Sequence, residues 1–239
     1  DSLVGYLNRH YAPNRMVVCV AGNVKHQAVV RKVSKLLEGF DRSAAALDRV
    51  SANGYSASHI TVSKPVQQAH LVVGTRAIGS TDPRRTVLSV LNTVLGGGMS
   101  SRLNQNIREK YGFCYSVYSF ANMMADTGDV GVYIGTDAGK VERAKKLVIR
   151  ELEKLAEKAV TERTLARAKQ QLKGSLMLGL ESMSNRMLRL GRVELTFGRH
   201  FTLDEIIEEI DAVTSDEVRS LAEEHFNRDS LSSVAIVPA

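Results

Sequence analysis

The sequence predicts an α+β fold built from a duplicated unit, with strands near the middle of the chain and helices after them. Two strand-like runs, Phe113 to Phe120 and Asp129 to Thr136, flank the turn "MADTG", a pattern typical of a hairpin. From Ala138 to about His225 the apolar residues recur at helical spacing instead. Strands followed by a run of helices indicate the α+β class.

The duplication is indicated by two similar stretches at the ends of the chain. "DSLVGYLNRHYAPNRMVVCVAG" from Asp1 and "DEVRSLAEEHFNRDSLSSVAIV" from Asp216 align without gaps, so that His10 falls on His225 and Tyr11 on Phe226. Each copy predicts a helix ending in His and an aromatic residue, then a turn and a strand. The end of a domain has this appearance when the domain is duplicated.

The elements before the middle of the chain follow in order. The first part predicts a helix to about Tyr11, a turn at Pro13, a strand from Met16 to Ala21, and a second helix with one apolar stripe. Residues 41–58 lose this periodicity and are expected to form a linker.

Beyond the linker, "HITVSKPVQQAHLVVGTRA" predicts two strands and "TDPRRTVLSVLNTVLGGG" a helix that ends at its glycines. Another helix is expected to open at Ser100, a natural N-cap, and to close at Gly112. The pair Thr214 and Glu217 predicts a capping box, and "SLSSVAIVP" predicts the last strand.

Composition excludes several classes of protein. The 239 residues are 44% hydrophobic, enough for one large domain or for one domain plus a piece of another. Lys and Arg number 32 against 26 Asp and Glu, a net charge of +6, but the two signs alternate in segments such as "GKVERAKKLVIRELEKLAEK". That alternation is typical of a solvated helical face and not of a nucleic-acid-binding arm. With 5% aromatic residues and no Trp, the chain offers few platforms for stacked bases.

The cellular compartment of the protein is predicted from the length of its apolar runs and from its cysteines. No apolar run approaches the roughly 20 residues of a membrane span. Cys19 and Cys114 stand alone, without the spacing of a metal or redox pair, which favours a reducing, cytoplasmic compartment. The chain begins at Asp1 and not at Met, so a cut or processed end is expected there.

Three candidate chemistries have weak sequence support. "LGGGMSSRL" lacks the Lys of a Walker A loop and follows a helix, so Gly96, Gly97 and Gly98 are better explained as a helix end and tight turn than as a phosphate loop. "LAEEH" resembles half of a zinc motif, but no second His accompanies His225. Cys114 is more simply a small buried hydrophobe than a nucleophile.

Arg108 and Tyr115 form the fourth candidate. They lie on either side of the Gly112 turn, where a helix ends and a strand begins, and both are donors suited to a carbonyl or a developing oxyanion. Spacing alone leaves another explanation open, in which Arg108 pairs with a surface acid and Tyr115 packs in the sheet.

Several motifs together resemble one family. "LGGGMSSRL", "IREKYGFCYSVYS", "QQAHLVVG" and "YAPNRMVVCVAGNV" are similar to stretches of the pitrilysin-like or insulinase-like zinc metallopeptidases, which include the mitochondrial processing peptidases and their bacterial relatives. The resemblance runs over essentially the whole chain. It implies a clamshell of duplicated α/β-sandwich halves, each with a mixed, mainly antiparallel sheet covered by helices.

The resemblance also implies a division of labour between halves. Residues 1–40 would be the tail of the N-terminal catalytic half, and residues 59–239 the C-terminal half that binds no metal, so zinc is expected only in a longer parent protein. Arg108 and Tyr115 match the family's Arg and Tyr that contact the substrate backbone and the scissile carbonyl. Gly96, Gly97, Gly98 and Ser100 are then expected to form a substrate-binding loop.

The resemblance leaves two functions open. The parent protein is either an active zinc metalloendopeptidase of a bacterial cytoplasm or a metal-free partner subunit that binds extended peptide; this chain alone is expected to be inactive. The expected partners are a peptide or unfolded polypeptide, the catalytic half, and a second subunit in a homodimer or heterodimer. Neither nucleic acid nor a membrane is expected as a partner.

Overall fold

The structure, a computed structural model, describes residues 2–40, 50, 52 and 54–239. The chain divides into two compact units, one made of residues 1–50 and 175–202 and the other of residues 51–174 and 203–239. The predicted linker, residues 41–58, falls largely on 41–49, 51 and 53, which lie outside the described residues. The predicted boundaries at 40 and 59 stay a prediction, and residues 175–202 group with the N-terminal residues.

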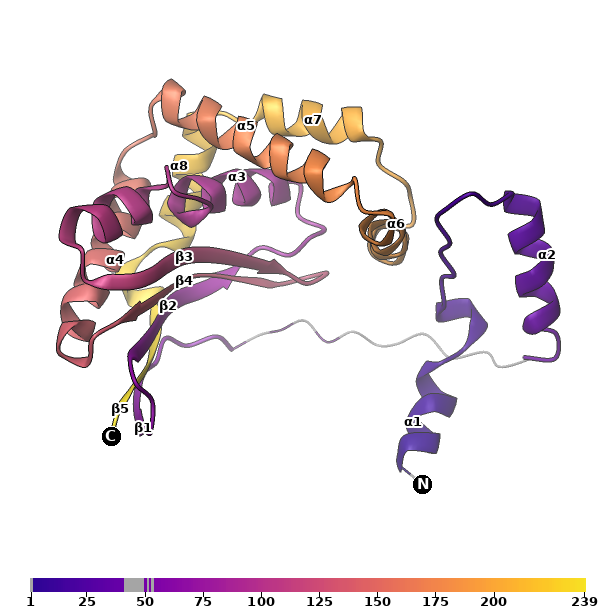
Figure 1. The fold of residues 1–239 in the computed structure, drawn as a ribbon, viewed down its shortest axis with the longest axis horizontal. Helices are drawn as coiled ribbons and strands as arrows, with labels where there is room; N and C mark the ends of the chain where they lie inside the picture. The colour runs from indigo at the N-terminus through magenta and orange to yellow at the C-terminus, as the bar shows by residue number, and fades with distance from the viewer. Residues whose placement is uncertain (1, 41–49, 51, 53) are drawn as a thin grey trace. The chain divides into compact units, whose positions relative to one another are not determined.

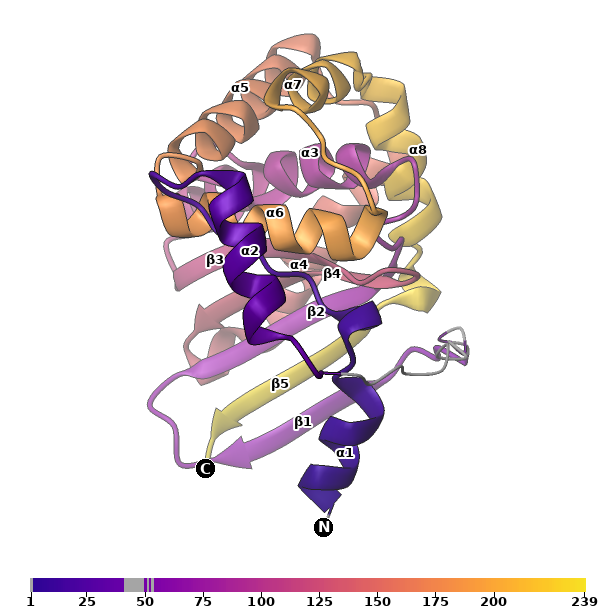
Figure 2. The same ribbon diagram turned by 90° about the vertical axis from the view of Figure 1, so that its right-hand side faces the viewer.

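The larger unit is built on one five-stranded sheet with strand order β1-β5-β2-β4-β3. Strands β1 and β5 are parallel, whereas β5–β2, β2–β4 and β4–β3 are antiparallel. The fold class is therefore confirmed as α+β with a mixed, mainly antiparallel sheet. The strands, visible in this order in Figure 2, are β1 (His59–Lys64), β2 (Ala69–Ala77), β3 (Cys114–Met123), β4 (Gly128–Thr136) and β5 (Ser232–Pro238).

Helices of this unit cover one face of the sheet, as Figure 1 shows for α3, α4 and α8. Strand β2 alternates strictly between buried and half-buried residues, so Leu71 and Val73 face the helices while Val72 and Arg76 face the opposite side. We call that opposite side the open face. The helical segments are α3 (Arg85–Gly96), η2 (Asn104–Glu109), η3 (Ala138–Lys140), α4 (Val141–Glu157), α5 (Glu162–Gly179), α7 (Leu203–Ala212), α8 (Ser215–His225) and η4 (Arg228–Ser230); residues 175–179 of α5 belong to the smaller unit.

The core lies between the sheet and these helices. Helix α3 buries Leu88, Leu91 and Leu95 at helical spacing against β3, and α4 buries Val148 and Leu152. Each such side chain stabilises the unit by about 1.5–3 kcal/mol when it is removed from water. The predicted capping box is present, because the Thr214 backbone donates to Glu217 Oε2 at 2.7 Å and the Glu217 backbone donates to Thr214 Oγ1 at 3.2 Å.

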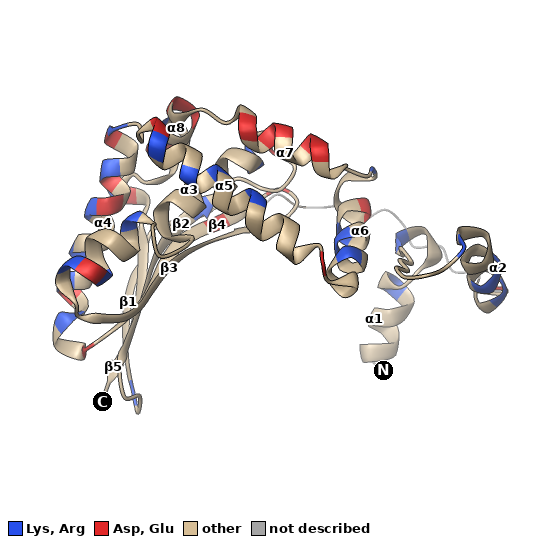
Figure 3. Cartoon of the chain, turned by 45° about the horizontal axis from the view of Figure 1, so that its top comes forward, with Lys and Arg blue, Asp and Glu red and all other residues tan. Residues whose placement is uncertain are grey.

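Charge on the helices is unevenly distributed. Figure 3 shows that acidic residues gather on α7, while α4 carries residues of both signs. Two of these acids connect α7 to its neighbours: Arg85 donates to Glu209 at 2.7 Å, and Lys173 pairs with Asp211 at 2.7 Å. The interleaved charges predicted for α4 are therefore a solvated face, with one exception described below.

The smaller unit contains three helices and a short 3₁₀ turn among the described residues. The extended segment 16–20 lies against α6, where a side chain on Gly191 would meet Cys19 Sγ at 3.3 Å. The elements are α1 (Ser2–His10), η1 (Pro13–Arg15), α2 (His26–Leu36) and α6 (Met183–Phe197).

One predicted strand is absent and one cap is shifted. Residues 16–21 are extended, but among the described residues they have no ladder partner and do not form a strand. A strand is defined by its hydrogen-bonded neighbour, which the sequence pattern alone does not supply. Ser100 is exposed, and the helix expected to open there begins at Arg102, after the buried Ser101.

Candidate functional site

The helix that carries Arg108 is irregular. It runs over residues 102–111, and its central part, Asn104–Glu109, is a π-helix. Such segments are rare and often occur at functional sites. Arg108 is exposed, and within the described part of the chain its guanidinium forms no ion pair.

Gly112 ends this helix as predicted. Its φ is +64°, a conformation that favours glycine, and its N–H donates to the carbonyl of Arg108 at 2.9 Å. The chain therefore turns directly from Arg108 into strand β3.

Tyr115 lies on an irregularity in that strand. The register of β3 against β4 shifts between Cys114 and Ser116, so Tyr115 has no partner in the ladder and its side chain is 63% exposed. Bulges of this kind redirect a side chain out of the regular alternation and recur beside active sites. Tyr115 is thus not packed in the sheet, contrary to the simpler of the two explanations left open by spacing.

The hydroxyl of Tyr115 donates to Asp137 Oδ1 at 3.2 Å. This hydrogen bond and the negative charge of Asp137 raise the pKa of Tyr115 above its ordinary value. The hydroxyl therefore stays protonated at neutral pH and acts as a donor.

The pKa of Cys114 indicates how close Arg108 lies to Tyr115. Burial raises the pKa of the Cys114 thiol, and the positive charge of Arg108 acts in the opposite direction. Arg108 therefore lies within electrostatic reach of the residue next to Tyr115. The net upward shift keeps the buried thiol protonated, which agrees with Cys114 as a small hydrophobe.

A buried carboxylate fixes the position of the 102–111 helix. Glu151 of α4 is buried and accepts hydrogen bonds from Asn106 at 2.8 Å, from Arg102 at 3.0 Å and from Lys154 at 2.7 Å. Burial would raise the pKa of Glu151, but the bonds from Lys154 and Asn106 and the charge of Arg102 outweigh it, so the pKa is lowered. Glu151 is therefore ionised and joins the helix of Arg108 to α4.

Gly96, Gly97 and Gly98 lie where neighbouring atoms leave no room for a side chain. A side chain on Gly96 would meet the backbone nitrogen of Ser119 at 2.2 Å, and one on Gly97 would meet Thr93 at 2.7 Å. One on Gly98 would meet Gln171 at 2.5 Å. Helix α3 ends at Gly96 with Gly97 as its C-cap, so the helix end and tight turn are confirmed. A substrate-binding loop formed by these glycines and the exposed Ser100 stays a prediction.

Asp137 and Glu151 were not identified from the sequence as residues of the site, although the sequence pattern contains a signal for each. Asp137 directly follows β4, whose pairing partner at that end is Cys114, so the register of the predicted hairpin places it near Tyr115. Glu151 lies on the apolar stripe of α4 that includes Val148 and Leu155. A charged residue on a buried stripe calls for buried partners.

The site supplies no ligand set for zinc. Among the described residues there is no group of three or more His, Cys, Asp or Glu that could hold a metal ion. Within the same part of the chain, no helix is long and apolar enough to span a membrane.

The fold defines a class: it is the α+β fold seen in solved structures described as a peptidase M16 inactive domain and as a protease. A crystal structure of a peptidase M16 inactive domain from Pseudomonas fluorescens superposes with a TM-score of 0.81 at 24% identity, over 91% of this chain and 52% of that one. A protease from Helicobacter pylori superposes with a TM-score of 0.88 at 21% identity, over 99% of this chain and 58% of that one. At these identities the likeness shows the fold.

The family follows from the sequence. Residues 1–172 match the family model of the peptidase M16 inactive domain, and the chain belongs to this family. An uncharacterized zinc protease of Streptomyces coelicolor is 39% identical over 95% of this chain and 51% of its own length. The uncharacterized zinc protease YmxG of Bacillus subtilis is 38% identical over 96% of this chain and 56% of its own length.

The chain therefore spans about half the length of the curated relatives it matches. The resemblance to the C-terminal half of pitrilysin-like metallopeptidases, drawn from the sequence, is confirmed. The names of these relatives, as zinc proteases, are consistent with zinc in a longer parent protein.

Proposed function

We propose that this chain provides the substrate-clamping half of a zinc metalloendopeptidase that hydrolyses peptides in a closed chamber. Zinc would be held by residues outside this chain, since the described residues offer no ligand set for it. The proposal includes the catalytic half and a peptide or unfolded polypeptide as partners, with a homodimer or heterodimer as the assembly.

One observation supports the proposal: Tyr115 and Arg108 lie on either side of the same turn. The Tyr115 hydroxyl is protonated, and its side chain is exposed on a bulge. The Arg108 guanidinium has no ion-pair partner among the described residues. Both groups donate hydrogen bonds. A peptide carbonyl that develops negative charge needs such donors, and they act best when they are already in place. On substrate binding, Tyr115 exchanges Asp137 for the carbonyl oxygen.

The test uses the protein extended to the length of its curated relatives, with Tyr115→Phe as the variant. We expect the substitution to lower kcat by about 10², the effect of losing one oxyanion donor. The matched control is Tyr118→Phe, because Tyr118 is exposed on the same strand and stacks on Tyr133 at 4.9 Å. The control should change kcat by less than about twofold. Equal kcat values for wild type and Tyr115→Phe would refute the role.

The second candidate is a metal-free partner subunit that binds extended peptide without hydrolysis. This second function is supported by the matching family model, which describes the peptidase M16 inactive domain. Zinc stoichiometry of the longer protein separates the two: about one zinc per chain supports the enzyme, and none supports the partner subunit.

A further inference from the structure

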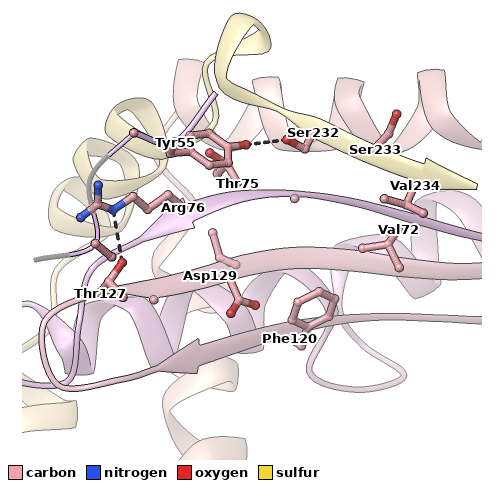
Figure 4. Close-up of a pocket in the computed structure, with 15 residues that line it drawn as sticks. Tyr55, Val72, Thr75, Arg76, Phe120, Thr127, Asp129, Ser232, Ser233 and Val234 are labelled. Carbon is pink, nitrogen blue, oxygen red and sulfur yellow. Dashed lines mark hydrogen bonds between the residues drawn. The ribbon is translucent and has the colours of Figure 1, made fainter. Parts of the chain in front are cut away.

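The open face of the sheet contains a pocket of about 470 Å³. It lies within the larger unit, over strands β5, β2, β4 and β3 (Figure 4), and neither Arg108 nor Tyr115 lines it. Its volume is within the range of about 300–1,000 Å³ that is typical of sites for small ligands or side chains. Nothing in the proposed function accounts for it.

One end of the pocket is apolar. Val72, Val234 and Phe120 line it, and Val234 is 41% exposed. The hollow exists because Gly74 and Gly131 are paired across β2 and β4, so neither strand fills this part of the face with a side chain. A side chain on Gly131 would meet the Phe120 ring at 2.7 Å.

The other end carries one positive and one negative side chain, Arg76 and Asp129, which form no ion pair with each other. Arg76 donates from Nε to Thr127 Oγ1 at 3.2 Å, and across the described residues its guanidinium forms no ion pair. Asp129 is its partner in the β2–β4 register, but its carboxylate instead accepts a hydrogen bond from Asn122 at 2.9 Å. A half-buried guanidinium without a carboxylate favours an anionic ligand.

The rim beside Arg76 is fixed. Tyr55 donates to the carbonyl of Ser230 at 2.6 Å and contacts Ser232 Oγ at 2.8 Å, as the dashed line in Figure 4 shows for Ser232. Arg76 and the apolar end are therefore held on strands and a tethered side chain, and the pocket is largely preformed.

We propose that this pocket binds an extended polypeptide that inserts an apolar side chain between Val72, Phe120 and Val234 and places a neighbouring carboxylate on Arg76. The inference deepens the proposed function, on which it rests, by naming a substrate class: peptides with an aromatic or aliphatic residue next to Asp, Glu or a free carboxyl terminus. Charge complementarity with Arg76 selects this occupant over a neutral one.

The test measures fluorescence anisotropy of three fluorescein-labelled peptides with the 239-residue chain: Gly-Gly-Phe-Glu-Gly-Gly, the same peptide with Gln for Glu, and the same peptide with Ala for Phe. The peptide with both Phe and Glu should bind at least about tenfold more tightly than either analogue, the discrimination typical of one pocket group or one charged pair. Equal affinities for the three peptides would overturn the proposal.

Variants locate the site. Val234→Trp fills the pocket and should weaken the Phe-Glu peptide about tenfold. Val62→Trp is the matched control, because Val62 is 37% exposed and pairs with Ile236 on the same face but does not line the pocket. If both Trp variants weaken binding equally, or neither does, the pocket is not the site.

Two charge variants test Arg76 without changing the apolar end. Arg76→Gln should remove the preference for Glu over Gln while keeping the preference for Phe over Ala. Asp129→Asn removes a like charge near the ligand carboxylate and should raise affinity for the Phe-Glu peptide about twofold to threefold. A preference for Glu that survives Arg76→Gln would contradict the assignment.

The longer protein distinguishes this inference from the proposed function. If it lacks zinc and peptidase activity but shows the same peptide preferences, the enzyme proposal fails and the pocket stands. If the 239-residue chain binds the peptide and the longer protein does not, the rest of the polypeptide covers the pocket, and the inference is overturned.

Discussion

His225, at the end of α8, is a mostly buried histidine whose Nε2 has no hydrogen-bond partner among the described residues. Burial lowers the pKa of the ring, and the charge of Arg84 acts in the same direction; the charges of Glu224, at 3.9 Å, and Asp82 and the backbone of Arg76 act against them without reversing the shift. The folded protein therefore keeps His225 neutral at a pH where an unfolded chain binds a proton.

This difference predicts a loss of stability in mild acid. As the pH falls below about 6.5, the unfolded chain takes up the His225 proton before the folded protein does, so the free energy of unfolding falls. The slope contributed by one such group is at most about 1.4 kcal/mol per pH unit. Urea unfolding of the 239-residue chain at several values between pH 7 and pH 5 measures it.

The control for this prediction is a second histidine. His225→Gln should flatten the dependence in this range, whereas His200→Gln, which changes an exposed histidine, should leave it in place. An unchanged slope in His225→Gln would show that another group is responsible.

At the scale of single residues, the positions of Arg108 and Tyr115 around Gly112 made them a candidate pair, and the family resemblance then favoured a functional role over a structural one; their catalytic roles stay predictions. Their local setting could be partly foreseen, because Gly112 and the hairpin register follow from turn chemistry and alternation. The π-helical turn under Arg108 and the bulge at Tyr115 could not, since each inserts a residue against the regular period. Arg76, which forms no ion pair among the described residues, was also missed, because its position opposite Asp129 depends on the β2–β4 register, which was not predicted from the sequence.

At the scale of elements, Glu151 is the contact that joins the 102–111 helix to α4. We expect Glu151→Gln to lower the free energy of unfolding by about 2–3 kcal/mol, because a buried charged acceptor of hydrogen bonds from three side chains is lost. The matched control is Glu153→Gln on the same helix. Glu153 pairs at 3.2 Å with Arg228, which is 72% exposed, so this change should cost less than about 1 kcal/mol.

The pH dependence of this effect has a fixed sign. Because the pKa of Glu151 is lowered in the folded protein, its stabilisation is present above the ordinary carboxyl value of about 4.3 and is lost as the pH falls further. The difference in unfolding free energy between wild type and Glu151→Gln should therefore be largest near pH 7 and shrink below pH 4. A difference that is constant over this range would mean that Glu151 acts through packing and not through its charge.

The predictability of elements differs by type. The helices, the hairpin and the last strand were predicted because their periodicity and end signals are local, as the Thr214 capping box illustrates. The strand expected at residues 16–21 was wrong, although the equivalent segment, β5, pairs with both β1 and β2. The two segments have similar patterns, and only the presence of neighbouring strands separates them.

At the scale of the whole molecule, the duplication is visible in structure as well as in sequence. In the alignment of the two copies, the 3₁₀ turn η1 falls on η4, α1 falls on α8, and the extended residues after η1 fall on β5. The copies differ in burial. Four apolar positions of the second copy are at most 3% exposed, and the equivalent positions of the first are 43–57% exposed; the pairs are Leu221 with Tyr6, Ala222 with Leu7, Phe226 with Tyr11, and Leu231 with Met16.

This contrast predicts that, in a longer protein, other residues pack against the exposed apolar side chains of the first copy. A core pattern in the sequence is stabilising only where it removes apolar surface from water. In the second copy, neighbouring strands and packed helices bury these positions. The segment 16–20 would then pair as a strand, as its counterpart β5 does. The expected division of the chain, with residues 1–40 as the tail of one half and residues 59–239 as the other half, requires that this packing exists.

Methionine oxidation followed by mass spectrometry measures this directly, because a buried thioether reacts only when the structure opens. Met16 should oxidise about tenfold more slowly in the longer protein than in the 239-residue chain, which corresponds to about 1.4 kcal/mol of added protection. Met124, which is 62% exposed in the β3–β4 turn, serves as the control and should react equally in both. Equal oxidation of Met16 in the two proteins would mean that the repeat preserves a pattern without its packing, and the proposed boundary between the halves would have to move.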